Sequence, residues 1–148
     1  LETALDGADV FIGVSVGDVV TPEMIQSMND RAIVFAMANP IPEIMPELAK
    51  EAGAFIVGTG RSDFPNQINN VLIFPGIFKG ALDAQVPQFT SEMKLAAAWA
   101  LAGAIETPTL SEILPSPLNK NVAYLVSEAV KEAAKQLSRS IPKHVVMG

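Results

Sequence analysis

The sequence has 148 residues, a formal net charge of −6 and a hydrophobic fraction of 49%. This length and apolar content suffice for one domain with a sizeable core, and they argue against a disordered chain. Ten basic residues against sixteen acidic ones leave no positive excess to neutralise nucleic-acid phosphates. The chain has no cysteine and one histidine, His144, which excludes a disulfide framework and argues against a Ser-His-Asp triad or a histidine-rich metal site.

The apolar runs and the start of the chain bear on where the protein works. The chain begins at Leu1 inside a helix-like phrase, and its first residues do not show the positively charged and apolar pattern of a signal segment. Its longest apolar runs, 71–77 and 95–102, are far shorter than the roughly 20 residues that a membrane-spanning helix needs. We therefore expect a soluble, cytoplasmic piece of a larger protein, without a membrane or nucleic-acid partner.

The first half of the chain alternates apolar runs with short helical segments. Four β-rich apolar runs are predicted to be strands: 8–15, 32–38, 54–57 and 71–74. Continuous runs of this kind are typical of parallel strands covered on both faces. Short helices are predicted from Pro22, after the cap Thr21, and from Pro46, with Gly53 as the stop. The alternation predicts an α/β fold with a partial Rossmann-like, doubly wound parallel sheet.

Helices dominate the second half of the chain. Three helical segments are predicted, 76–85, 90–105 and 121–137, with a proline-rich linker over 107–118. The segment 90–105 is rich in alanine and apolar on most sides, so we expect it to be buried. The last segment is amphipathic, and its apolar stripe consists of Val122, Leu125, Val126, Ala129, Val130, Ala133 and Leu137. The sheet is therefore expected to be followed by C-terminal helices.

Amide side chains follow the predicted strands where ligands bind in open parallel sheets, which is beyond the carboxyl ends. The nominated loops are 15–19, 39–44, 59–66 and the residues around Asn69 and Asn70. An asparagine amide both donates and accepts, so it suits a carboxamide, a hydroxyl or a carboxylate. For a single asparagine such as Asn39, a turn or a helix cap is the alternative. Both interpretations stay open on the sequence pattern alone.

Charged residues near these loops have structural explanations. Gly58-Thr59-Gly60 nearly matches a phosphate-binding loop, but Asp63 replaces its third glycine and would repel a pyrophosphate. Arg61 and Asp63 are predicted to form a local ion pair, with attraction of an anionic substrate by Arg61 as the alternative. Glu43 and Glu47 are interpreted as acids at a helix start rather than as a catalytic pair. Tyr124 is interpreted as a packing residue rather than an acid catalyst, and Trp99 as a core or interface residue.

Three segments form longer motifs: 32–44 (AIVFAMANPIPEI), 58–83 (GTGRSDFPNQINNVLIFPGIFKGALD) and 113–118 (ILPSPL). Together they resemble malic enzyme in its compact bacterial or archaeal form. The similarity covers about residues 8–137, and its longest run is far longer than a lone glycine signature. The resemblance implies that residues 1–85 are the C-terminal part of an NAD(P)-binding Rossmann-like domain. Residues 86–148 are then a helical extension that packs on the same domain.

The resemblance also implies oxidative decarboxylation of malate to pyruvate and CO2, with NAD or NADP as hydride acceptor and Mg or Mn as Lewis acid. The family's catalytic tyrosine and lysine, its metal ligands and its phosphate loop lie upstream of the matched segment. No catalytic or metal-binding residue is therefore assigned to this chain. Asn39 would contact the nicotinamide ribose or the substrate, Asn69 and Asn70 would bind the malate carboxylate and hydroxyl, and Ser15 lies on a loop that passes the cofactor.

The implied partners are the remaining N-terminal part of the enzyme and a second copy in a homodimer. The chain by itself is expected to be inactive. Two alternatives remain: another Rossmann-domain dehydrogenase, acting on an amino acid or a folate, and a non-catalytic nucleotide-sensing module. The length of the match over 58–83 disfavours the first alternative.

Overall fold

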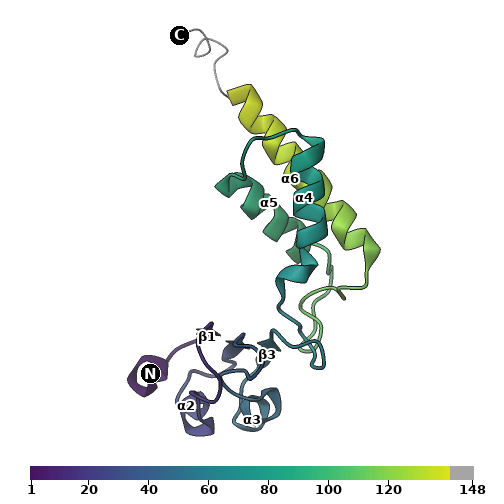
Figure 1. Ribbon diagram of the computed structural model, residues 1–148. Helices are drawn as coiled ribbons and strands as arrows, with labels where there is room; N and C mark the ends of the chain where they lie inside the picture. The colour runs from purple at the N-terminus through teal and green to yellow at the C-terminus, as the bar shows by residue number, and fades with distance from the viewer. Residues whose placement is uncertain (141–148) are drawn as a thin grey trace. The chain divides into compact units, whose positions relative to one another are not determined.

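The chain forms two compact units. The computed structural model describes residues 1–140, the last four by their backbone alone. The first unit contains Leu1–Asn69 and Thr107–Leu114, and the second contains Asn70–Glu106 and the chain from Pro115 onward. Figure 1 shows the strands in the first unit and the longer helices in the second. Within residues 1–140, no helix is both long and apolar enough to cross a bilayer.

A parallel sheet of three strands, in the order β1-β2-β3, is the centre of the first unit. The strands are β1 (Val10–Gly13), β2 (Ile33–Ala36) and β3 (Ile56–Thr59). Gly13 pairs with Ala36, and Ala36 pairs with Thr59, so the carboxyl ends of the strands lie at one edge. The predicted parallel α/β sheet is confirmed.

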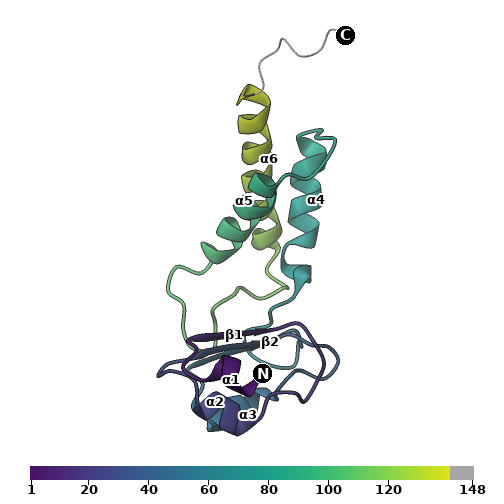
Figure 2. The same cartoon turned by 90° about the vertical axis from the view of Figure 1, so that its left-hand side faces the viewer.

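The first unit contains three short helices, one before β1 and one in each connection between strands. They are α1 (Glu2–Leu5), α2 (Pro22–Gln26) and α3 (Pro46–Glu51). The Thr21 hydroxyl accepts a hydrogen bond from the Met24 amide, as expected for a helix cap. Gly53 follows α3 with φ +108°, a conformation that glycine adopts without steric cost. Figure 2 shows the three helices on the same face of the sheet.

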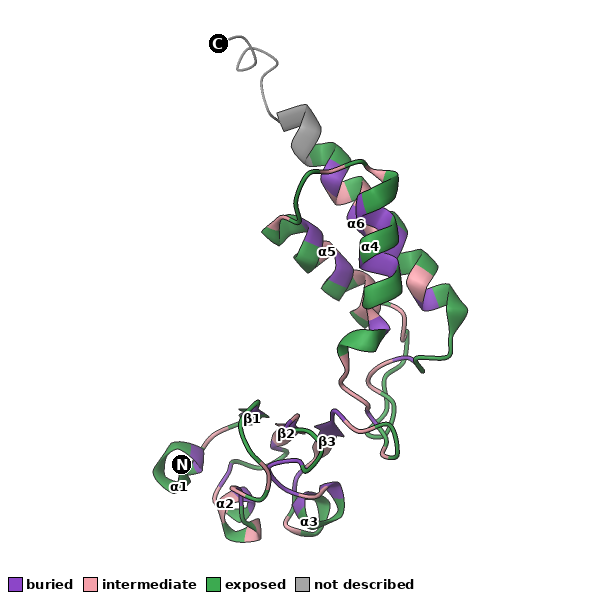
Figure 3. Ribbon diagram, in the orientation of Figure 1, coloured by how far each residue is buried: buried purple, intermediate pink, exposed green. Residues whose placement is uncertain are grey.

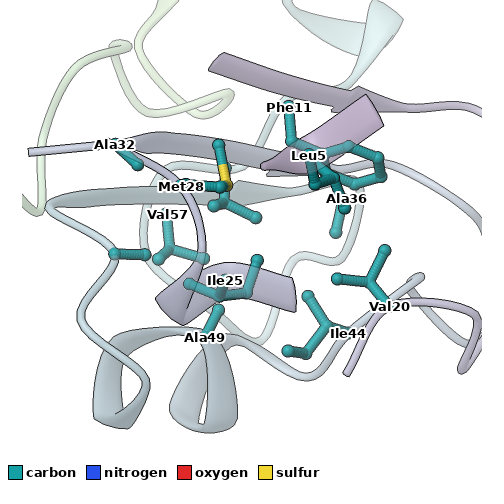
Figure 4. Close-up of a cluster of buried hydrophobic side chains, with 12 residues drawn as sticks. Leu5, Phe11, Val20, Ile25, Met28, Ala32, Ala36, Ile44, Ala49 and Val57 are labelled. Carbon is teal, nitrogen blue, oxygen red and sulfur yellow. The ribbon is translucent and has the colours of Figure 1, made fainter. Parts of the chain in front are cut away.

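Apolar side chains fill the space between this sheet face and the helices (Figure 4). Val34 from β2 and Ala49 from α3 are fully buried there. The expectation that both sheet faces are covered is wrong for β1, where buried and exposed residues alternate. Ile12 remains 62% exposed. An apolar run therefore marked the strand correctly but did not show how many of its faces are covered.

The second unit consists of helices. They are the 3₁₀ turn η1 (Asn70–Leu72), α4 (Phe74–Asp83), α5 (Ser91–Ala102) and α6 (Lys120–Ser140). A second core lies among α4, α5 and α6, where buried segments of the three helices are coloured purple in Figure 3. Its fully buried members include Met93, Val126 and Val130. This core contains no residue of the first core. Each unit thus has a hydrophobic interior of its own.

Three predictions for the second half are wrong. The run 71–74 is not a fourth strand, because it enters η1 and the start of α4. The segment around α5 is not buried on most sides, since Leu95 is exposed and Trp99 is 76% exposed. Tyr124, interpreted as a packing residue, is exposed as well.

The amphipathic segment 121–137 is confirmed as α6, with Val122, Val126 and Val130 buried. The side chain of Leu137 and the whole of His144 lie outside the described residues. The family resemblance also implies a division of the chain into part of a nucleotide-binding domain, 1–85, and a helical extension, 86–148. This division stays a prediction. The chain passes from one compact unit to the other after Asn69, after Glu106 and after Leu114.

Candidate functional site

A hollow of about 350 Å³ lies at the carboxyl edge of the sheet, where the loops after β2 and β3 leave it. Its lining residues are Asn39, Pro40, Gly60, Arg61, Ser62, Asp63, Gln67 and Asn69. Asn39 and Asn69 follow different strands, yet they line the same cavity. The structure thus brings together two of the residues that the sequence pattern placed at this edge.

Backbone hydrogen bonds return the loop after β3 to the end of its own strand. The Ile68 amide donates to the Thr59 carbonyl at 2.7 Å, and the Thr59 amide donates to the Asn66 carbonyl at 3.3 Å. The Asn69 side-chain amide donates to the Gly60 carbonyl at 3.3 Å. These bonds hold Asn69 beside the first residue of the loop, at the cavity wall.

Arg61 and Asp63 form a bidentate ion pair in the same wall. The Arg61 Nε and Nη2 atoms donate to the two Asp63 carboxylate oxygens at 2.9 and 2.6 Å. This hydrogen bonding, more than the opposite charge, lowers the pKa of Asp63 and raises the pKa of Arg61. Both groups are therefore ionised near neutral pH, and the predicted ion pair is confirmed. The two formal charges of the pair cancel in the cavity wall.

Glu43 is a buried carboxylate that links two of the loops at this edge. Its Oε1 atom accepts hydrogen bonds from the Ser15 amide at 2.8 Å and from the Ser15 hydroxyl at 3.2 Å. Its Oε2 atom accepts from the Ala38 amide at 2.9 Å. Burial raises the pKa of Glu43. The hydrogen bonds together lower this pKa by more than burial raises it, so the pKa lies below the ordinary value.

The interpretation of Glu43 as an acid at a helix start is wrong. Helix α3 begins at Pro46, and Glu43 lies in the loop before it with a fully buried side chain. Glu47 is exposed in the first turn of α3, as expected. The position of Glu43 ahead of the helix was the only indication in the sequence that it is not a helix-start acid. Its partner Ser15 could not be inferred from a local pattern, because it lies 28 residues away in the sequence.

The loops after β1 and β2 are also joined through their backbones. The Asp18 amide donates to the Pro42 carbonyl at 3.0 Å, and the Val20 amide donates to the Glu43 carbonyl at 2.9 Å. Gly17 packs so closely that a Cβ atom there would lie 2.7 Å from the Ile41 side chain. The two loops therefore form one closely packed structure.

Asn66 is a buried asparagine that the sequence analysis missed. Its amide donates to the carbonyls of Val57 and Leu110 at 2.9 and 2.8 Å, and its oxygen accepts from the Ile113 amide at 3.0 Å. Its φ of +55° is one that asparagine adopts more readily than most residues. Asn66 therefore joins the segment 107–114 to the rest of the first unit by hydrogen bonds, which is a structural role.

The other two predicted site residues do not line the cavity. Ser15 follows β1, and its amide and hydroxyl are both bonded to Glu43. Asn70 begins η1 and belongs to the second unit. Their roles in binding stay predictions, as do those of Asn39 and Asn69.

The donors and acceptors of the cavity fit parts of a nicotinamide cofactor. The amides of Asn39 and Asn69 match the hydrogen-bonding pattern of a carboxamide, a ribose hydroxyl or a carboxylate. The Mg or Mn ion that the family resemblance implies has no comparable set of ligands in the described residues. Among residues 1–140, no three His, Asp or Glu side chains are grouped closely enough to hold a metal ion. We therefore assign no metal to the described part of the chain.

Comparison with known proteins places this arrangement in a family. The family model for the NAD-binding domain of malic enzyme matches residues 6–135. The bifunctional malic/malolactic enzyme of Bacillus subtilis (strain 168) is 56% identical over 138 residues, which are 92% of this chain and 34% of that protein. The NAD-dependent malic enzyme of Geobacillus stearothermophilus is 54% identical, over 90% of this chain and 28% of that protein. The NADP-dependent malic enzyme of Halomonas elongata is 42% identical, over 90% of this chain and 36% of that protein.

A solved structure agrees with these sequence relatives. The crystal structure of malic enzyme from Pyrococcus horikoshii matches with a TM-score of 0.89 and 51% identity, over 93% of this chain and 32% of that one. The chain thus spans about a third of the length of these four relatives. With a family model matching most of its residues, the chain belongs to the malic enzyme family, as part of the NAD-binding domain.

Proposed function

We propose that this chain takes part in the oxidative decarboxylation of malate to pyruvate and CO2, with NAD or NADP as the hydride acceptor. The observation that supports this most is the single cavity shared by Asn39 and Asn69 in a chain of this family. Relatives named for NAD and for NADP both match the chain, so either cofactor is consistent with the family.

The proposed roles follow from the chemistry of the amide group. Asn69, together with Asn70, binds the malate carboxylate and hydroxyl, and Asn39 binds the nicotinamide ribose or the substrate. Ser15 lies on the loop that passes the cofactor. The bound cofactor supplies the hydride acceptor, while these residues hold malate and the nicotinamide ring at reacting distance. Mg or Mn, if bound, is held by residues outside this chain.

We further propose that the chain works with an N-terminal part like the one that the family resemblance implies, in the cytoplasm and as a homodimer. The term intact enzyme is used below for this chain joined to such an N-terminal part. That of the Bacillus subtilis relative is an example. A clean monomer in size-exclusion chromatography of the intact enzyme would contradict the homodimer.

The function is tested by assaying the intact enzyme with malate and Mn, and with NAD and NADP in turn. Pyruvate and reduced cofactor should appear together, and Asn39→Ala should lower kcat/KM at least about tenfold. Faster turnover with an amino acid or a folate would favour a different dehydrogenase. Binding of cofactor and malate in calorimetry without any product would favour a nucleotide-sensing module.

A further inference from the structure

We propose that Glu43 is a positioning residue, whose buried carboxylate holds the loop containing Asn39 in its place at the cavity. This inference rests on the proposed function, because it concerns the malate reaction. The carboxylate does not line the cavity itself. It acts through the backbone of the residue next to Asn39.

Hydrogen bonds show how this holding works. Oε2 of Glu43 accepts the amide proton of Ala38, the residue directly before Asn39. Oε1 accepts hydrogen bonds from the amide and the hydroxyl of Ser15, two residues after the end of β1. One fully buried side chain therefore fixes the start of the Asn39 loop to the neighbouring strand end. Hydrogen bonds to an ionised acceptor are about twice as strong as those between neutral groups.

Gly13 provides the space in which the carboxylate lies. A Cβ atom at Gly13 would lie 2.5 Å from Cδ and 2.6 Å from Oε1 of Glu43. Any larger residue there would push the carboxylate away from its donors. The last residue of β1 and the acid in the next loop therefore have to match one another.

The charge of Glu43 matters as well as its shape. A carboxylate only accepts hydrogen bonds, and its three partners here are donors. A glutamine of nearly equal size would direct an NH2 group at one or two of those donors. Glu43→Gln should therefore shift the loop by a fraction of an ångström while the apolar packing remains.

The experiment measures kcat and KM for malate in the intact enzyme, well below its unfolding temperature. Glu43→Gln should lower kcat/KM at least about tenfold, because small displacements of binding groups are costly in catalysis. Glu47→Gln, an exposed acid four positions along, is the matched control and should stay within about twofold of the wild type. Unchanged kcat/KM in folded Glu43→Gln would overturn the proposal.

A double-mutant cycle distinguishes positioning from general stability. If Glu43 acts through Asn39, Glu43→Gln should cost little more once Asn39→Ala is already present. Additive losses from the two substitutions would overturn the proposal. No effect of Asn39→Ala on kcat/KM would overturn both this inference and the role proposed for Asn39. A loss in Asn39→Ala without a loss in Glu43→Gln would remove the inference alone.

Gly13→Ala provides a second test if Glu43→Gln does not fold. The added methyl group displaces the carboxylate without removing it, so the same loss of kcat/KM and the same non-additivity with Asn39→Ala are expected. Wild-type kinetics in a folded Gly13→Ala enzyme would show that the carboxylate position does not matter.

Discussion

The Glu43 carboxylate should make the free energy of unfolding of the chain depend on pH in the acidic range. Its pKa lies below the ordinary value of 4.5 in the folded protein, because its hydrogen bonds outweigh the effect of burial. Such a group stabilises the fold at pH values above its ordinary pKa, and this contribution is lost as the pH falls toward the folded pKa. The stability lost in Glu43→Gln should therefore be largest near neutral pH and shrink as the pH falls below 4.5.

This prediction is checked by urea unfolding of the 148-residue chain from about pH 3 to about pH 7. Glu47→Gln is again the control, and its curve should run parallel to that of the wild type. A constant difference between wild type and Glu43→Gln at every pH would contradict the assigned pKa shift.

Substitution of two nearby asparagines should affect different properties: stability for Asn66 and kcat/KM for Asn69. Asn66→Gly removes three hydrogen bonds to backbone groups, one buried and two partly buried, while glycine still accepts the φ of +55°. It should lower the free energy of unfolding by about 2 kcal/mol or more. Asn69→Ala removes a bond to Gly60 at the cavity wall, so it should cost less than about 1 kcal/mol but damage kcat/KM for malate.

Chemical unfolding and steady-state kinetics on the same intact-enzyme variants measure this contrast. A kcat/KM for Asn69→Ala equal to that of the wild type would count against its proposed role. If Asn69→Ala destabilised the protein as much as Asn66→Gly, the assignment of the two residues to different tasks would be wrong.

The range of each interaction explains which of these residues the sequence pattern could find. Asn39 and Asn69 follow strands that local apolar runs already mark, so their place at the sheet edge was predictable. Asn66 bonds to residues 44 and 47 positions away, and Glu43 to one 28 positions away. Local patterns do not encode such distant partners. The two buried polar residues were therefore missed or misinterpreted.

Helix α4 approaches α6 closely through Gly76 and Gly80, one turn apart. A Cβ atom would lie 2.7 Å from the Ala123 carbonyl at Gly76, and 2.5 Å from the Ser127 carbonyl at Gly80. These neighbours are backbone atoms, so the helices themselves must move. Alanine at either position should destabilise the second unit by about 1–3 kcal/mol, despite the better helix propensity of alanine.

Thermal unfolding of Gly76→Ala and Gly80→Ala checks this packing. Gly103→Ala at the end of α5 is the control, since φ there is an ordinary −73° and the nearest atom to a Cβ would be 3.3 Å away. Equal unfolding temperatures for all three variants would contradict the close approach of α4 and α6.

Local chemistry also explains which elements could be predicted. The three strands and the starts of α2 and α3 follow from apolar runs, Thr21 and the first-turn prolines, and all were found. The false strand at 71–74 arose because its short apolar run was interpreted as a strand, although Pro75 follows it. Proline at the first helical positions begins a helix instead, and α4 starts at Phe74. Alanines made 90–105 a clear helix but did not show which side is covered.

At the scale of the whole molecule, the chain contains a cavity at the edge of its sheet and about a third of the length of the Bacillus subtilis relative. The charged groups in the cavity wall are Arg61 and Asp63, which hold one another in the ionised state. The lowered pKa of Asp63 and the raised pKa of Arg61 disfavour proton transfer by either group near neutral pH. The described cavity is therefore suited to binding and orientation rather than to acid–base chemistry.

We accordingly predict that the folded 148-residue chain forms no pyruvate from malate, with NAD or NADP and with Mn present. The intact enzyme, assayed at the same molar concentration, is the positive control, and circular dichroism confirms that the isolated chain is folded. Activity in the isolated chain that disappears in Asn39→Ala would contradict the prediction, because it would show a complete reaction centre within these residues. Activity that persists in Asn39→Ala would instead indicate a contaminating enzyme.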